Sequence, residues 1–276
     1  MNTLDQFKLD GKFCVITGGA GLLGIKHAEA LIDAGANIIL VDKNTAKLNI
    51  AVSGLSTRPG HKSTIFGYNF DITNEEAVRY HIECMYRYPG SIDVLINNAA
   101  NTPRAEDISS LTRLEDFPIK SWREDFDVSV TGAFLMSREI GKRMAENRGG
   151  VILNIVSDLG IIAPDQRIYR KEGLKDSEQP VKPVSYSVAK HALIGLTKYL
   201  ATYWADKGVR VNSISPGGVY NGHLSVGFVR ELISLIPMGR MAHADEYKAA
   251  ILFMCSDASS YMTGANLVID GGRTCW

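Results

Sequence analysis

A tyrosine and a lysine stand four residues apart, at Tyr186 and Lys190, near the start of a predicted helix. Because residues at i and i+4 share one face of a helix, both side chains are expected to reach the same site. A free tyrosine titrates near roughly pH 10, too high for a base at neutral pH, and a nearby ammonium or a bound nicotinium lowers that pKa. The pair is therefore a candidate general base with its activating cation.

The same spacing recurs at Tyr203 and Lys207, farther along the same predicted helix, so the spacing alone does not identify the site. Ser157 favours the first pair, because it ends a predicted buried strand. The carboxyl ends of parallel strands deliver residues to the ligand crevice. We interpret the second pair as solvated, and predict that Ser157, Tyr186 and Lys190 are catalytic.

A glycine-rich loop follows the first predicted strand and precedes a helix. Gly19, Gly21 and Gly24 fit the G-x-G-x-x-G spacing in the context that gives it meaning. Such glycines permit a tight turn, close approach of a pyrophosphate and packing of the helix on the strand, while N–H groups and the helix dipole attract phosphates. A merely tight turn is the alternative. We expect the cofactor to be held by Gly18, Gly21, Leu22, Leu23 and Gly24.

Asp42 ends the second predicted strand, 18 residues after Gly24. A carboxylate at this place can accept hydrogen bonds from both adenosine ribose hydroxyls and would repel a 2′-phosphate. It therefore favours NAD over NADP as the cofactor. Lys43 weakens this discrimination, and a strand-terminal turn aspartate is the alternative interpretation.

Short apolar runs alternate with helical periodicity along the whole chain. Continuous apolar runs indicate strands buried on both faces, as in a parallel sheet. The predicted strands are 12–17, 37–42, 63–70, 92–96, 150–157, 209–215 and 266–270, and the predicted helices include 27–34, 75–86, 122–146, 184–207 and 244–255. This alternation predicts an α/β fold, a single doubly wound, Rossmann-like parallel sheet with helices on both faces. We expect one domain over 1–276, with a loop insertion at about 164–183.

The composition excludes several classes of protein. The 276 residues carry 30 Lys+Arg and 30 Asp+Glu, so the basic surplus typical of nucleic-acid binders and polybasic membrane-surface proteins is missing. The scattered cysteines form no CxxC pair and have no histidine cluster nearby, which indicates reduced thiols and no metal site. The N-terminus lacks a signal peptide's apolar core, and no apolar run could span a membrane. We expect a cytoplasmic protein.

The ordered set of motifs resembles the short-chain dehydrogenase/reductase family, in its compact single-domain branch, along nearly the whole chain. The matching segments are Thr17–Gly24, Asp42, Asp71–Ile72, Asn97–Ala100, Ser157, Tyr186 with Lys190, Pro216–Gly218, Pro237–Arg240 and Asp270–Gly272. The resemblance implies a nicotinamide-dependent enzyme acting on CH–OH groups, assembled as a homotetramer or homodimer.

The resemblance also implies roles for individual residues. Tyr186 would be the general acid/base, Lys190 would hold the nicotinamide ribose, and Ser157 would hydrogen-bond the substrate oxygen. Asn97 would help to fix the fourth strand, and the Val219 backbone would lie near the carboxamide. The remaining residues implied at the cofactor site are Asp71 and Ile72, flanking the adenine, and Asn98, Ala99, Pro216 and Gly217.

Three features depart from the family pattern. The loop reads TGxxGxxG, the spacing of the extended branch that contains sugar-nucleotide epimerases and dehydratases. Ser129 stands where the family places a catalytic asparagine, and a serine there could still join a water relay. Ser157 and Tyr186 are 29 residues apart, wider than usual, and the polar insertion supplies the excess.

The insertion begins where the family's substrate contacts begin. We predict that Arg167 or Arg170 holds an anionic substrate group, with Arg104 converging from another loop, because arginine forks suit phosphate. A merely solvated loop is the alternative, since its charges nearly balance. Asn221 and His223 are further candidates for binding substrate hydroxyls.

These loops contain few long apolar residues, which favours a small polar substrate: a sugar, a sugar phosphate or another polyol. The sequence therefore predicts an NAD(H)-dependent oxidoreductase that interconverts a secondary alcohol and a ketone. The alternatives are a sugar-modifying epimerase or dehydratase with recycled NAD, and a non-catalytic NAD-binding subunit. The glycine loop, Ser157–Asp158 and the APDQRIY segment are also similar to oxidoreductases of flagellin modification and legionaminic-acid-type sugar pathways.

Overall fold

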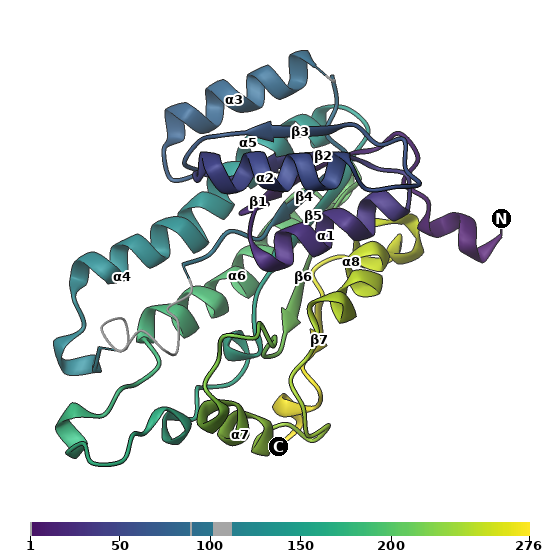
Figure 1. Cartoon of the computed structure of the whole chain (residues 1–276). Coiled ribbons are helices and arrows are strands. Elements are labelled where there is room, and N and C mark those ends of the chain that lie inside the picture. The colour runs from purple at the N-terminus through teal and green to yellow at the C-terminus, as the bar shows by residue number, and fades with distance from the viewer. Residues whose placement is uncertain (1, 89, 102–111) are drawn as a thin grey trace.

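The computed structural model describes residues 2–88, 90–101 and 112–276. Its centre is a seven-stranded, wholly parallel sheet in the order β3-β2-β1-β4-β5-β6-β7 (Figure 1). The strands are β1 Phe13–Thr17, β2 Asn37–Val41, β3 Ile65–Tyr68, β4 Val94–Asn97, β5 Gly150–Ile155, β6 Val209–Pro216 and β7 Asn266–Ile269. The predicted doubly wound, Rossmann-like α/β fold is confirmed.

Helices cover both faces of the sheet (Figure 1). One face packs on α1, α2 and α8, and the other on α3, α5 and α6, so alternate strand residues are buried in two separate clusters. The helices are α1 Leu22–Asp33, α2 Thr45–Ser56, α3 Glu75–Arg87, α4 Ile119–Phe126, α5 Gly132–Glu146, α6 Val184–Tyr203, α7 Val226–Ser234 and α8 Lys248–Cys255.

The helix predicted over 122–146 contains a change of winding. A π-helical segment, Asp127–Thr131, joins α4 to α5 without a break in the helical backbone. α1 begins at Leu22, earlier than predicted, because Gly21 in extended conformation is its N-cap. Neither α2 nor α7 had a counterpart among the predicted helices.

A buried amide network holds the two central strands together. Asn97 donates to Asn154 Oδ1 at 2.8 Å and to Ser137 Oγ at 2.9 Å, and Asn154 donates to Thr197 Oγ1 at 2.8 Å. All four side chains are buried, so these bonds satisfy polar groups that would otherwise be costly. The network fixes the ends of β4 and β5 relative to α5 and α6.

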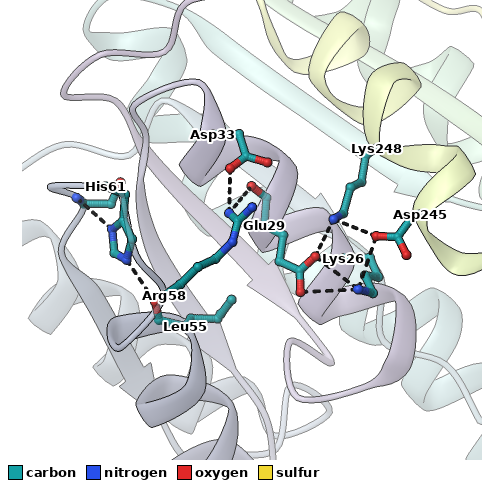
Figure 2. A network of polar contacts seen from close by, with 9 residues as sticks. Lys26, Glu29, Asp33, Leu55, Arg58, His61, Asp245 and Lys248 are labelled. Atoms are coloured by element: carbon teal, nitrogen blue, oxygen red, sulfur yellow. Dashed lines mark hydrogen bonds and ion pairs between the residues drawn. The ribbon is translucent and has the colours of Figure 1, made fainter.

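An ion-pair network ties α1 to the segment before α8 (Figure 2). Lys26 contacts Glu29 and Asp245 at 3.2 Å each, and Lys248 contacts the same two carboxylates. Arg58, beyond α2, donates to the Glu29 carbonyl at 3.3 Å. These contacts link α1 to the start of α8 and to the residues that follow α2, on one face of the sheet.

Figure 1 places α7 and the C-terminus at the same end of the molecule as the carboxyl ends of the central strands. Ile168, from the predicted insertion, packs with Leu232 and Ile236 in a small separate core. The fold therefore brings the insertion, α7 and the C-terminal segment around one edge of the sheet.

The tight turn before β5 contains a glycine whose substitution tests the backbone conformation there. Gly149 has φ +77°, and a Cβ added to it would collide with the carbonyl oxygen of Gly208. We expect Gly149→Ala to lower the free energy of unfolding by about 1–3 kcal/mol, from the strained dihedral and the displaced strand. Gly54→Ala is the matched control, because it lies in α2 with no atom within 4 Å of the new Cβ. This control should stabilise by about 0.5–1 kcal/mol. The free energies of unfolding are measured by urea titration. A change of the same sign in both variants would contradict the constraint assigned to the Gly149 backbone.

Candidate active site

A pocket of about 530 Å³ lies at the carboxyl ends of the central strands. It collects most of the residues predicted for the cofactor and for catalysis, from segments far apart in the sequence. The predicted residues that line the pocket are Gly18, Gly21, Leu22, Leu23, Asp42, Asn98, Ala99, Ser157, Tyr186, Lys190, Pro216, Gly217, Val219 and Asn221.

Several predicted residues do not line this pocket. The pocket lining does not include Gly24, Asp71, Ile72, Ser129, Arg167, Arg170 or His223. Ser129 is buried inside the π-helical segment. Arg104 lies outside the described residues. The roles predicted for these residues therefore have no support from the pocket geometry.

The glycine loop has the close backbone contacts that a dinucleotide cradle needs. Gly18 has φ +59°, and a Cβ at Gly24 would lie 2.5 Å from the Gly18 carbonyl oxygen. Asp42 Oδ2 accepts a hydrogen bond from the Ala20 N–H at 3.3 Å, while its Oδ1 accepts from the Asn44 N–H at 2.9 Å. The loop and the carboxylate thus face one pocket, and these residues fit an adenine dinucleotide.

Thr17 and Asn98 lock the glycine loop to the end of β4. Asn98 Nδ2 donates to the carbonyls of Thr17 and Gly18 at 3.0 and 3.1 Å. The Thr17 hydroxyl accepts from the N–H groups of Asn98 and Ala99 at 3.0 and 3.2 Å. The phosphate-binding turn is therefore held rigidly by side chains of two neighbouring strands.

Tyr186 and Lys190 extend from the first two turns of α6, as their spacing predicts. The Lys190 ammonium donates to the Ile155 carbonyl at 2.8 Å and lies 5.8 Å from the Tyr186 ring centroid. Burial, and to a lesser extent the nearby Lys182 charge, lower the pKa of Lys190 to about 8. Lys190 is thereby fixed at the end of β5, beside the phenol.

The pKa of Tyr186 in the protein alone is set mainly by burial. The pKa of Tyr186 is raised to about 12, mainly by burial; a hydrogen bond with Ser157 opposes the rise and the Asp158 charge contributes to it. The sequence predicts that the neighbouring ammonium and a bound nicotinium together lower this pKa. Desolvation of the phenolate is the largest contribution in the protein alone, so the lowering expected with a bound nicotinium stays a prediction.

A buried ion pair behind Ser157 is the main feature that the sequence did not reveal. Arg273 Nη1 contacts Asp158 Oδ2 at 2.8 Å, and the two side chains are 7% and 5% exposed. Asp158 Oδ1 accepts from the Ser157 hydroxyl at 2.8 Å and from the Leu159 N–H at 2.8 Å. The pair thus orients the Ser157 hydroxyl.

The arginines predicted to bind an anion are paired locally instead. Arg167 forms a two-pronged contact with Asp165, with its closest approach at 2.6 Å, and its side chain is 82% exposed. Arg170 lies 3.6 Å from Asp176, and both are exposed. The basic residue of this loop that lines the pocket is Lys182.

The substrate end of the pocket is more apolar than predicted. α7 and its neighbours contribute Leu224, Phe228, Leu232 and Met241 to the wall, and Tyr169 stacks obliquely on Phe228. The prediction concerned the loops, whereas much of this apolar wall comes from α7, an amphipathic helix with its apolar side facing the pocket.

No group of three or more His, Cys, Asp and Glu side chains suited to a metal ion occurs within 2–88, 90–101 and 112–276. Over the same ranges, no helix has the length and apolar character needed to cross a membrane.

The fold and the site define the class of Rossmann-fold oxidoreductases, and comparison with known proteins gives the family. The family described as enoyl-(acyl carrier protein) reductase matches residues 21–274. D-threitol dehydrogenase of Mycolicibacterium smegmatis is 34% identical over 273 residues, which cover 98% of this chain and 95% of the relative. The NAD-dependent glycerol dehydrogenase of Listeria innocua is 31% identical, with coverages of 98% and 96%.

Solved structures agree with these relatives. A short-chain type dehydrogenase/reductase from Mycobacterium marinum superposes with a TM-score of 0.86 at 30% identity, covering both chains completely. A gluconate 5-dehydrogenase from Burkholderia cenocepacia, in complex with NADP and tartrate, has a TM-score of 0.86 at 27% identity, also over both whole chains. The chain belongs to the short-chain dehydrogenase/reductase family and is an oxidoreductase that acts on CH–OH groups.

The Asp158–Arg273 pair predicts a shift in pH dependence. In Arg273→Met the Asp158 carboxylate loses its counter-ion and raises the pKa of Tyr186 further. Alcohol oxidation needs the deprotonated phenol, so its pH–rate profile should move to higher pH. A shift of one unit would lower the rate about tenfold at a pH below the midpoint.

Two variants control this experiment. Arg167→Met removes an exposed, locally paired arginine from the same molecule and should leave the profile in place. Asp158→Asn combined with Arg273→Met removes both charges and should return the profile toward that of the wild type. A profile unmoved in folded Arg273→Met would show that the pair does not act on Tyr186.

Proposed function

We propose that this protein is an NAD(H)-dependent dehydrogenase that interconverts a secondary alcohol and a ketone on a polyol or sugar. One observation carries the proposal: the Tyr186 phenol, with Ser157 and Lys190 beside it, faces the same pocket as the glycine loop and Asp42. A group that moves a proton thus adjoins a cradle suited to a dinucleotide.

The named relatives support this substrate class. D-threitol dehydrogenase and glycerol dehydrogenase are named for polyols, and the structural neighbour named for gluconate holds tartrate. Each of these is a hydroxylated small molecule. The polar residues at the substrate end of this pocket, among them Asp158, Lys182 and Asn221, suit such a substrate.

Oxidation removes one hydride and one proton from the carbinol. When bound, the nicotinamide supplies the hydride acceptor. Ser157 hydrogen-bonds the substrate oxygen, and Tyr186 as phenolate takes the hydroxyl proton. Lys190, held by the Ile155 carbonyl, has further N–H donors for a ribose and places a positive charge near the phenolate. Reduction runs through the same groups with Tyr186 as the acid.

The assignment of the base is tested by Tyr186→Phe. The substitution removes the hydroxyl and keeps the ring, so turnover should fall by about 10²–10⁴ while NADH affinity changes little. Tyr203→Phe is the matched control, because Tyr203 belongs to the second YxxxK pair and is 62% exposed. Steady-state rates and NADH fluorescence titration are the measurements. Retained turnover in Tyr186→Phe would overturn the assignment.

The preference for NAD rests on the charge of Asp42. In Asp42→Ala the repulsion of a 2′-phosphate is lost, so the ratio of kcat/KM for NAD to that for NADP should fall by about tenfold or more, equivalent to about 1.4 kcal/mol. Asp42→Asn separates charge from structure, because it keeps an acceptor for the Ala20 N–H. An unchanged ratio in both variants would place cofactor specificity elsewhere.

Measuring NADH formation during turnover also tests two alternative functions. The TGxxGxxG loop favours an epimerase or dehydratase that recycles its cofactor, and such an enzyme would convert a sugar without net NADH formation. A non-catalytic NAD-binding subunit would bind NADH and convert no polyol or sugar phosphate. Net NADH formation in stoichiometry with a ketone argues against both.

We also propose a homotetramer or homodimer in the cytoplasm, as the family resemblance and the reduced cysteines suggest. Asp71 and Ile72 are proposed to flank the adenine, and Ser129 to act through a water. A place in flagellin modification or a legionaminic-acid-type pathway stays a prediction, since the relatives named above are named for polyols or gluconate.

A further inference from the structure

Lys182, at the end of the 164–183 loop, places a positive charge beside Tyr186. Its ammonium lies 4.2 Å from the Tyr186 ring centroid, closer than that of Lys190 at 5.8 Å. Lys182 lines the main pocket and also an adjoining hollow of about 350 Å³. The ammonium therefore stands at a boundary of the site, next to the group that exchanges a proton with substrate.

Within 2–88, 90–101 and 112–276, Lys182 has no counter-ion of its own. Asp158 is committed to Arg273, and Asp125, on α4, accepts a hydrogen bond from the Ser185 hydroxyl. Lys190, on the same helix as Tyr186, adds a second positive charge. Among the residues that the structure describes, no carboxylate lies within ion-pair distance of the Lys182 ammonium.

Burial makes this unpaired charge costly. The pKa of Lys182 is lowered to about 8, mainly by burial; the Asp158 and Asp125 charges oppose the lowering, and Arg273 contributes to it. A half-buried ammonium of this kind gains free energy from any anion that enters the pocket. Arg167 and Arg170 offer no such site, because each has an aspartate partner outside the pocket.

We propose that Lys182 binds an acidic group of the substrate, a carboxylate or a phosphate close to the reacting carbinol, so that the site prefers an acidic polyol to a neutral one. This inference rests on the proposed function. It replaces the predicted roles of Arg167 and Arg170 with a lysine from the same loop. Because the ammonium lies on the face of the Tyr186 ring, an acidic group near the carbinol comes within its reach.

The test presents one carbon skeleton in three forms: threitol, threonate and threitol phosphate. The wild-type protein should show a higher kcat/KM for at least one acidic form than for threitol, and the better of the two identifies the acidic group. In Lys182→Met this preference should fall by about tenfold or more, equivalent to about 1.4 kcal/mol. The preference is a ratio within one variant, so any effect of the substitution on Tyr186 itself cancels.

Two controls and a pH series sharpen the result. Lys182→Arg keeps the charge and should keep the preference, while Lys171→Met removes an exposed lysine of the same loop and should not alter it. The preference of the wild-type protein should decline as the pH rises through about 8, where the free lysine loses its charge. Threitol, which is neutral, serves as the reference at each pH.

The outcomes separate this inference from the proposed function. Turnover of threitol with equal or poorer turnover of both acids, and a ratio unchanged in Lys182→Met, overturns the role of Lys182 alone. Absence of turnover with all three substrates contradicts the proposed function. The role of Lys182 is then decided by calorimetric binding of threonate to the protein with NADH: tighter binding than threitol, lost in Lys182→Met, supports it, and equal binding overturns it.

Discussion

Seven parallel strands end at one edge of the sheet, and every chemical feature of this protein depends on that constraint. Parallel pairing brings the ends of β1, β2, β4, β5 and β6 together, although they are separated by up to two hundred residues of sequence. The glycine loop, Asp42, Ser157 and the Pro216 segment therefore surround one pocket. The buried amides of Asn97 and Asn154 hold the two central strands in register there, so the edge is rigid enough to position a proton donor.

The parts of the site that follow from local rules could be predicted from the sequence. Continuous apolar runs identify buried strands, and the spacing of Tyr186 and Lys190 places both side chains on one helix face. The glycine spacing and the acid at the end of β2 carry their own physical meaning. These features depend on short stretches of chain, and the structure places each of them as the local pattern indicates.

The remaining parts depend on contacts that no local pattern encodes. Arg273 pairs with Asp158 across 115 residues, and nothing in the segment around it marks it as a partner. Arg167 and Arg170 were predicted to bind an anion, but each contacts an aspartate a few residues away in the sequence. The pKa of Tyr186 likewise depends on how deeply α6 buries the phenol, which the YxxxK spacing does not determine. Long-range pairing and desolvation thus decide the electrostatics of the site.

The central claim is that Tyr186 and a bound nicotinamide oxidise a carbinol with net transfer of hydride. Threitol deuterated at its secondary carbinol carbons, incubated with the protein and NAD, tests it most directly by NMR of the products. The account predicts deuterium at C4 of the nicotinamide ring in NADH, with an equal amount of ketone formed. Deuterium that stays in or returns to the polyol, with no NADH accumulating, would contradict the claim.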